Sequence, residues 1–302
     1  MRVAVTGGNG LVGGEAVMQL AEGSSHEVLA LGKGPCRLPR GRYRYAPIDL
    51  GDGKSTAAAL REFRAEAVLH AGAATNVDAC ERDPELAWRV NVDGTAEVAR
   101  ACRELGARLL ALSTDYVFDG LSGPYSEDDL PNPRGVYARS KRSGEEAALL
   151  LAPDAAVGRL AVVYGGRSVT RDTFASQVVE RLSRGEPVRA FEDQRVSTTL
   201  ASAGAARCLE LLLETRYRGV IHLSDATVLD RVELAHRIAK RFGLAGDIVP
   251  VRTADAHLAA PRPLRGGLKV DRAAGLLRNV PLAIDEALAR FEQEWRSRRR
   301  GL

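Results

Sequence analysis

Tyr137 and Lys141 lie four residues apart in the segment Tyr-Ala-Arg-Ser-Lys. On an α-helix this spacing places both side chains on one face, about one turn from each other. An ammonium group beside a phenol stabilises the ionised phenol, so we expect Lys141 to lower the pKa of Tyr137 from roughly 10 toward neutrality. Such a phenol can donate a proton to the oxygen of a carbonyl group that is being reduced.

Thr114 supplies a second hydroxyl group for the same chemistry. It stands in the segment Ser113–Tyr116, upstream of the predicted Tyr137 helix, and can hold the oxygen that Tyr137 protonates. A Tyr–Lys pair at helical spacing also occurs by chance on solvated helix faces. However, only five of the 43 basic residues are lysines, which indicates that position 141 needs a compact ammonium group and not a guanidinium. We therefore predict that Thr114, Tyr137 and Lys141 are catalytic.

A glycine-rich segment near the N-terminus predicts a dinucleotide-binding turn. Residues 2–5 form a short apolar strand pattern, residues 7–13 read Gly-Gly-Asn-Gly-Leu-Val-Gly, and an amphipathic helix pattern follows. Gly7 permits a tight turn, Gly10 lets the backbone approach a pyrophosphate, and Gly13 lets the helix pack closely on the strand. The N-terminus of that helix attracts the phosphate charge.

The loop after the second predicted strand favours NADPH over NADH. Residues 27–31 form that strand, and an acidic residue at its end would bind the adenosine ribose. Gly32-Lys33-Gly34 stands there instead, with Arg37 close by. Lys33 or Arg37 can pair with a 2′-phosphate, and an ordinary basic surface loop is the alternative. We predict NADP as the cofactor, with NADPH preferred and NAD as the second choice.

The order of the apolar segments predicts an α/β fold with a doubly wound parallel sheet of the Rossmann type. Strand and helix patterns alternate in the first half of the chain, which yields right-handed βαβ units. After residue 165 the alternation weakens and Arg-rich polar segments increase. We predict a dinucleotide-binding domain of residues 1–165 and 197–224 and a smaller C-terminal substrate-binding lobe of residues 166–196 and 225–302. Strands are expected at 3–5, 28–31, 67–70, 109–112, 156–164 and 220–223, and long helices at 86–105 and 137–151.

Composition limits the class of protein. The chain has 302 residues, a net charge of +4 and no apolar run as long as the roughly 18 residues of a membrane span. Its N-terminal segment reads as a strand and not as a signal peptide. The five histidines form no metal-binding pattern, so we expect no metal. The four cysteines are scattered along the sequence, which is typical of a reduced, cytoplasmic protein, so we expect a cytoplasmic location. The basic segment 295–300 ends a predicted helix, where cations are favourable, so we expect neither nucleic acid nor membrane as a partner.

Further motifs make the sequence resemble the extended short-chain dehydrogenase/reductases, and within them the dTDP-4-dehydrorhamnose reductases. The segment 114–120, Thr-Asp-Tyr-Val-Phe-Asp-Gly, is the most specific part of this resemblance. The resemblance implies hydride transfer from NADPH to C4 of a dTDP-4-keto-6-deoxyhexose. It covers nearly the whole chain and rests on segments 7–13, 75–78, 90–91, 113–120, 137–145, 163–165, 193–194 and 262–268.

The resemblance also implies roles for individual positions. Thr114 and Tyr137 would bind the carbonyl oxygen, and Lys141 would hold the hydroxyl groups of the nicotinamide ribose. The residues implied in cofactor binding are Gly7, Asn9, Gly10, Leu11, Val12, Gly13, Lys33, Asp49, Leu50, Ala71, Gly72, Ala73, Tyr137 and Lys141. The residues implied in substrate binding are Thr75, Val77, Asp115, Tyr116, Val162 and Arg262.

Three positions depart from the pattern of the family. Val162 stands where the family usually has a Trp against the sugar ring, residues 197–199 read Ser-Thr-Thr in place of Ser-Pro-Thr, and Gly267 replaces a serine. The missing indole opens space beside the sugar, so the motifs predict the reduction chemistry but not the particular sugar. The residues that we expect to pair with substrate phosphates are Arg195, Arg262 and Arg265.

Two other functions stay open. A nucleotide-sugar epimerase would share Tyr137, Lys141 and the cofactor, but it would leave the cofactor unconsumed. A dehydratase is disfavoured, because Asp115 is followed by Tyr116 and not by the Glu of an acid/base pair. A non-catalytic NADP-binding regulatory subunit, like that of methionine adenosyltransferase, also resembles these reductases. We expect a nucleotide sugar as the partner molecule, and a homodimer is compatible with this interpretation.

Overall fold

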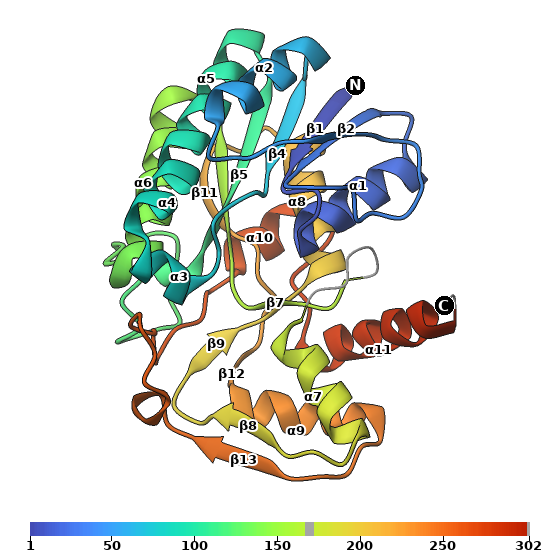
Figure 1. Cartoon of the computed structure of the whole chain (residues 1–302), viewed down its shortest axis with the longest axis vertical. Helices are drawn as coiled ribbons and strands as arrows, with labels where there is room; N and C mark the ends of the chain where they lie inside the picture. Colours follow the sequence, from blue (N-terminus) through green and yellow to red (C-terminus); the bar gives the residue numbers. More distant parts are fainter. Residues whose placement is uncertain (167–171, 301–302) are drawn as a thin grey trace.

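The computed structural model describes residues 1–166 and 172–300, which form two lobes, one above the other in Figure 1. The upper lobe contains a seven-stranded parallel sheet in the order β11-β6-β5-β4-β1-β2-β3. The chain winds outward in both directions from the neighbouring strands β1 and β4, which is the predicted doubly wound arrangement. The strands are β1 (Arg2–Thr6), β2 (Glu27–Gly32), β3 (Arg44–Pro47), β4 (Ala67–His70), β5 (Arg108–Thr114), β6 (Ala156–Leu160) and β11 (Gly219–His222).

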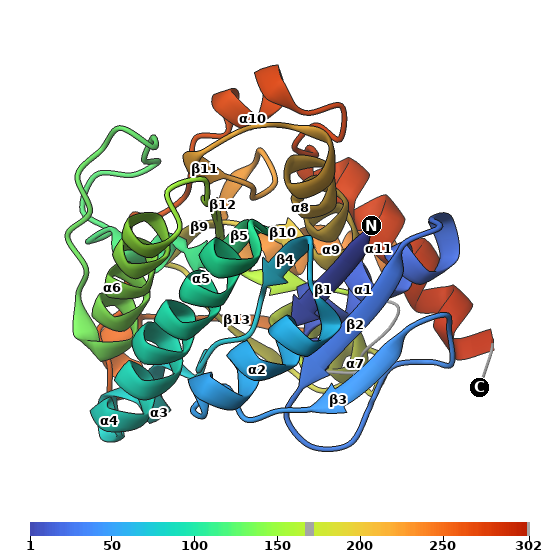
Figure 2. The ribbon, with the colours of Figure 1, turned by 90° about the horizontal axis from the view of Figure 1, so that it is seen from above.

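Helices cover both faces of this sheet. Val3 and Val5 of β1 and Val68 and Leu69 of β4 have no exposed surface, as expected for the centre of a parallel sheet that is buried on both sides. Figure 2, a view from above, shows α8 on one side of the strands and α2 and α5 on the other. One layer is α1 (Leu11–Gly23) and α8 (Ala201–Glu214), and the other is α2 (Gly53–Phe63), α5 (Gly94–Leu105) and α6 (Gly135–Leu151).

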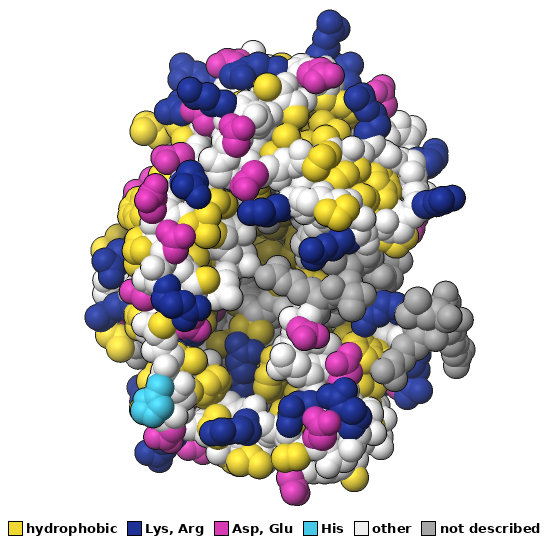
Figure 3. Space-filling model, in the orientation of Figure 1, with side chains coloured by type: hydrophobic (Ala, Val, Ile, Leu, Met, Phe, Trp, Pro, Cys, Tyr) yellow, Lys and Arg dark blue, Asp and Glu magenta, His cyan; other side chains and the backbone are white. Residues whose placement is uncertain are grey.

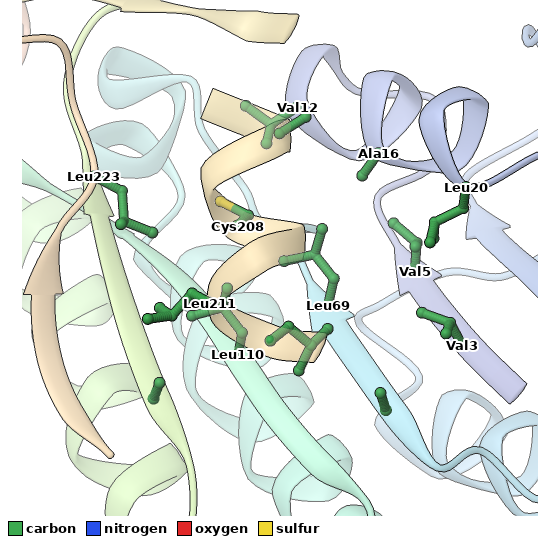
Figure 4. Close-up of a cluster of buried hydrophobic side chains, with 14 of the residues drawn as sticks. Val3, Val5, Val12, Ala16, Leu20, Leu69, Leu110, Cys208, Leu211 and Leu223 are labelled. Carbon is green, nitrogen blue, oxygen red and sulfur yellow. The ribbon is translucent and has the colours of Figure 1, made fainter. Parts of the chain in front are cut away.

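The core beneath α1 and α8 fixes the strand ends that carry the predicted site. Figure 4 shows Leu20 of α1 and Leu211 of α8 pointing toward Val5, Leu69 and Leu110 of the sheet. Each fully buried side chain of this size contributes about 1.5–3 kcal/mol through removal of its surface from water. The carboxyl ends of β1, β4 and β5 are therefore held in a fixed relation to one another.

The lower lobe has a core of its own. Phe242, Phe291 and Trp295 contact one another through their rings, at centroid distances of 5.5–6.4 Å. Its elements are α7 (Phe174–Ser183), β8 (Val188–Phe191), β9 (Arg195–Ser197), β12 (Val228–Asp230), α9 (Arg231–Phe242), β13 (Ile248–Val251), η3 (Thr253–Ala256) and α11 (Ile284–Arg300). By contrast, Ala273 of α10 (Asp271–Leu276) packs in the core of the sheet lobe. We propose the division into 1–165 with 197–224 and 166–196 with 225–302, with the exception of α10, which packs on the sheet lobe.

Two predicted elements differ from the structure, and one strand of the sheet was not predicted. The strand expected at 156–164 is interrupted, because Val162 has a φ of 30° between β6 and β7 (Val163–Tyr164), which pairs with β10 (Thr199–Leu200). The helix expected at 86–105 is divided into α4 (Pro84–Trp88), the π-helix η1 (Arg89–Asp93) and α5. The edge strand β3 was not predicted at all. The short helices α3 (Val77–Arg82) and η2 (Asp115–Val117) complete the site region.

Candidate active site

The glycine-rich turn of residues 7–13 forms a cradle between the ends of β1 and β4 and the start of α1. Gly7 has a φ of 70°, and a Cβ atom there would lie 2.7 Å from the Cα atom of Gly72. A Cβ atom at Gly13 would lie 2.3 Å from the carbonyl oxygen of Gly7. Among the residues that the structure describes, no side chain caps α1, which begins with Leu11 after Gly10, so its first N–H groups are suited to bind a phosphate. The cradle therefore fits a dinucleotide pyrophosphate.

The segment 71–73 and Leu50 lie against this cradle. The Gly72 N–H group donates a hydrogen bond to Oγ1 of Thr6, at 3.2 Å. A Cβ atom at Gly72 would lie 2.1 Å from Cδ1 of Leu50, so the Leu50 side chain covers the backbone at this point. The structure thus brings together residues 71–73, Leu50 and the glycine turn, all of which the sequence predicted to bind the cofactor.

Asn9 holds the loop that follows β2. Its amide nitrogen donates hydrogen bonds to the carbonyl oxygens of Lys33 and Pro35, at 3.0 and 2.9 Å, and its amide oxygen accepts one from the N–H group of Arg37. Lys33 forms an exposed ion pair with Asp49, at 3.1 Å. Exposed pairs of this kind contribute little stability, so a 2′-phosphate can compete with Asp49 for Lys33.

Thr114 and Tyr137 meet at the end of the sheet. Thr114 is the last residue of β5, Tyr137 lies in the first turn of α6, and their hydroxyl groups interact. Burial raises the pKa of Tyr137, and the Thr114 hydroxyl opposes this effect only in part. The predicted lowering of that pKa by Lys141 is wrong for this structure, because removing water from the ionised phenol has the larger effect. The phenol is consequently protonated at neutral pH, the form that donates a proton.

Lys141 lies one turn beyond Tyr137 on α6 and is buried, with only 6% of its surface exposed. Its Nζ atom donates a hydrogen bond to the carbonyl oxygen of Leu112 on β5, at 2.8 Å. Burial lowers the pKa of Lys141 to about 8, although the Glu145 carboxylate has the opposite effect. The ammonium group thus lies near the carboxyl end of β5 and can lose its proton in mildly alkaline solution.

Asn91 positions the helix that carries Tyr137, a role that the sequence analysis missed. Its side chain donates a hydrogen bond to Oγ of Ser140, at 3.0 Å, and accepts one from the N–H group of Ala74, at 2.8 Å. Ser140 in turn donates to the carbonyl oxygen of Tyr137, at 2.9 Å. A Cβ atom at Gly144 would lie 2.4 Å from the carbonyl oxygen of Asn91, so glycine allows η1 and α6 to approach. A polar residue inside a helical pattern was the available signal.

Asp115 and Tyr116 line the side of the site that faces the lower lobe. Asp115 is buried and accepts a hydrogen bond from Oγ1 of Thr114, at 3.2 Å. Burial raises the pKa of Asp115 to about 6. The rings of Tyr116 and Tyr137 meet edge to face, with centroids 5.8 Å apart. Arg231 of α9 interacts electrostatically with both Asp115 and Tyr116, and the sequence analysis did not identify it.

The remaining predicted substrate residues occupy three places around this region. Arg262 pairs with Asp78 at the start of α3, with an N–O distance of 2.5 Å. Thr75 precedes that helix and is exposed, while Val77 packs against the hydrophobic cluster that contains the predicted proton donor. Val162 is partly buried, and its φ of 30° is strained for a β-branched residue.

A hollow opens between the two lobes, with basic side chains at its rim and inside it (Figure 3). The doubly wound sheet, the glycine cradle and the buried Thr114, Tyr137 and Lys141 define a nicotinamide-dependent oxidoreductase of the short-chain dehydrogenase/reductase class. The family described as the RmlD substrate binding domain matches residues 1–297, and the chain belongs to this family.

Curated relatives span almost the whole chain. A probable low-salt glycan biosynthesis reductase, Agl14 of Haloferax volcanii, is 33% identical over 97% of this chain and 97% of its own length. The dTDP-4-dehydrorhamnose reductase of Mycobacterium tuberculosis is 36% identical over 86% of this chain and 82% of its own. The methionine adenosyltransferase 2 subunit beta of Bos taurus is 28% identical over 98% of this chain and 90% of its own.

Solved structures agree with the fold. A hypothetical dTDP-4-dehydrorhamnose reductase from Sulfolobus tokodaii has a TM-score of 0.84 and 31% identity, over 94% of this chain and 98% of its own. The dTDP-4-dehydrorhamnose reductase of Bacillus anthracis in complex with NADP has a TM-score of 0.83 and 26% identity, over 97% and 99%. MoeE5 in complex with UDP-glucuronic acid and NAD has a TM-score of 0.82 and 27% identity, over 98% and 100%.

Proposed function

We propose that this protein uses NADPH to reduce the C4 ketone of a nucleotide-activated 4-keto-6-deoxyhexose. The observation that carries the proposal is the contact between the Thr114 and Tyr137 hydroxyl groups at the edge of the dinucleotide cradle, with Lys141 buried beside them. Relatives named dTDP-4-dehydrorhamnose reductase support the sugar class.

The geometry supports a simple division of labour. The Thr114 hydroxyl holds the C4 oxygen, and the protonated phenol of Tyr137 donates its proton to that oxygen. The Lys141 ammonium holds the ribose hydroxyl groups and stabilises the ionised phenol after proton transfer. Asn91 keeps Tyr137 in position through Ser140. NADPH, when bound in the cradle, supplies the hydride.

The loop after β2 supports the preference for NADPH. The strand ends in Gly32, and Lys33 and Arg37 are exposed in the loop that Asn9 holds. Lys33 forms an ion pair with Asp49, whose carboxylate is itself exposed. Since a 2′-phosphate brings two negative charges to this loop, NADPH should bind more tightly than NADH.

The proposal is tested by following NADPH oxidation with a panel of dTDP- and UDP-linked 4-keto sugars and the corresponding free keto sugars. We expect dTDP-linked 4-keto-6-deoxyhexoses to be reduced far better than the free sugars. A Tyr137→Phe variant, which retains the cradle, serves as the inactive control. Absence of oxidation with every sugar, by folded protein that binds NADPH, would refute the reductase proposal.

The second candidate is a regulatory role. The similarity to methionine adenosyltransferase 2 subunit beta covers 98% of this chain, which is the observation that favours it. Such a protein would bind NADPH without turnover and would form a complex with a methionine adenosyltransferase. An epimerase would instead change the configuration of the sugar while the amount of NADPH stays constant, so product analysis in the same assay separates all three functions.

Location and assembly are also proposals. In the part of the chain that the structure describes, no helix is both long enough and apolar enough to cross a membrane. We propose a cytoplasmic location and a homodimeric state. Cell fractionation tests the first, and light scattering at several protein concentrations tests the second.

A further inference from the structure

Arg231 stands at the point where three segments of the lower lobe meet the sheet lobe. It is the first residue of α9 and follows β12 directly. The antiparallel pairing of β12 and β9 places Asp230 opposite Arg195, and Arg195 forms a further backbone bridge with Arg265. Arg231 therefore follows the residue that lies opposite Arg195, and Arg265 lies on the other side of β9. The sequence suggested Arg195 and Arg265 for phosphate binding, but it did not suggest Arg231.

The guanidinium group of Arg231 lies over the ring of Phe174, with Cζ 5.3 Å from the ring centroid. Phe174 begins α7, which packs beside α9. Arg231 keeps a small exposed surface, yet protein atoms surround it closely enough that burial lowers its pKa. Stacking on Phe174 fixes the guanidinium plane and leaves its N–H edge available for an anion.

No hydrogen bond or ion pair of the Arg231 guanidinium is found among residues 1–166 and 172–300. Two other arginines of this part of the lower lobe are paired with carboxylates. Arg262 is paired with Asp78, and Arg237, on the same helix α9, is paired with Glu233 and Asp285. A partly desolvated cation is costly without a counter-charge, so an anionic ligand would stabilise the state seen here.

The carboxylate of Asp115 interacts electrostatically with Arg231, but the two residues do not form an ion pair. Its oxygen accepts the hydroxyl hydrogen of Thr114 instead. The interaction places Arg231 beside the two residues that follow the predicted catalytic threonine. Arg195, Arg231 and Arg265 together can balance the two or more negative charges of a diphosphate.

We propose that Arg231 binds the diphosphate of the nucleotide sugar, with Phe174 holding its guanidinium group in the required orientation. This proposal rests on the proposed function, because it assigns the substrate of the same site. It also shifts the expected phosphate contact from Arg262, whose charge is already compensated by Asp78, to a residue outside the motifs of the family.

The test compares Arg231→Gln with Arg237→Gln, a control on the exposed side of the same helix. Binding of dTDP and of thymidine is measured by calorimetry in the presence of NADP. We expect Arg231→Gln to weaken dTDP binding by about 10- to 100-fold, as for loss of a charge-assisted contact, and to leave thymidine and NADP binding unchanged. Arg231→Lys should recover part of the loss, and Arg237→Gln should bind dTDP like the wild type.

Three results would overturn the proposal. Equal dTDP binding by Arg231→Gln and wild type would exclude the phosphate contact. A loss confined to sugars that carry a carboxylate would assign Arg231 to the sugar ring. If Arg231→Gln changed the pH dependence of turnover but left the dTDP affinity unchanged, Arg231 would serve only as a counter-charge of Asp115. Wild-type protein that reduces no 4-keto sugar, but binds dTDP in an Arg231-dependent manner, would instead refute the reductase function and support this site.

Discussion

Replacement of Asp115 by Asn should stabilise the protein at neutral and alkaline pH. Asp115 is 4% exposed, and its carboxyl group accepts a hydrogen bond from Thr114. Burial raises its pKa from 3.8 to about 6, because the desolvated carboxylate is disfavoured, and the Thr114 hydroxyl and the Arg231 charge oppose the rise. The amide of Asn resembles the protonated carboxyl group in shape and polarity but does not ionise.

The size of the effect follows from linkage between proton binding and folding. Since the pKa is higher in the folded state than in the unfolded state, the wild-type protein loses stability as the pH rises from 3.8 through about 6, and no more above that range. A difference of about two pKa units, at roughly 1.4 kcal/mol per unit, gives about 3 kcal/mol near pH 8 and about half of that near pH 5. Asp115→Asn should recover this free energy of unfolding.

Urea denaturation of the wild type and the variant between about pH 5 and pH 8 measures the difference. Asp255→Asn, in the exposed segment η3, serves as the control and should differ little from the wild type at any pH. Lower stability of Asp115→Asn than of the wild type near pH 8, or a difference that does not change with pH, would refute the argument from burial. Catalytic activity is expected to fall in the variant, because Asp115 holds the Thr114 hydroxyl.

Four further predictions concern turnover and cofactor binding. Tyr137→Phe should lower kcat by about 10²-fold or more with unchanged NADPH affinity, and near-normal turnover would contradict its role as proton donor. The kcat/KM of the wild type should decline above about pH 8, because the buried Lys141 loses its proton there, and a kcat/KM that does not change with pH would count against this assignment. The turnover of Lys141→Arg should be severely impaired, since a guanidinium does not fit the ammonium site. Lys33→Asp should reduce the preference for NADPH over NADH, and the preference of the wild type should weaken with added salt; equal cofactor affinities in both proteins would make Lys33 an ordinary surface residue. Gly13→Ala should weaken NADPH binding by about 10-fold or more, because its Cβ atom would lie 2.3 Å from the Gly7 carbonyl oxygen, and a normal dissociation constant would show that the turn can adapt.

The elements that sequence patterns predicted well are those whose signals lie in adjacent residues. The apolar run before the glycine turn is β1, the helix from Tyr137 to Leu151 lies within α6, and the strand at Ala67–His70 matches β4. Apolar runs predict buried strands and amphipathic spacing predicts helices, because the period of each pattern matches the geometry of one element. Edge strand β3 was missed, since its residues are only partly buried and carry no strong pattern.

Interruptions of regular structure depended on distant segments. The π-helix η1 forms where Asn91 bonds to Ala74 and Ser140, two segments that the fold brings beside it. Val162 adopts a positive φ where its carbonyl oxygen accepts a hydrogen bond from Thr199. In both places a tertiary contact outweighs the backbone conformation that the local sequence prefers. A local sequence pattern does not predict such a contact.

The sequence by itself determined the fold class, the cradle and the types of groups that could perform the chemistry. Glycine spacing, strand–helix alternation and the Tyr137–Lys141 interval each follow from local geometry. Only the tertiary structure decided the protonation and pairing of those groups. It buries Tyr137 so that its pKa rises, pairs Arg262 with Asp78, and leaves Arg231 beside Asp115. Desolvation and charge pairing depend on which distant atoms surround a group, so they appear only once the chain is folded.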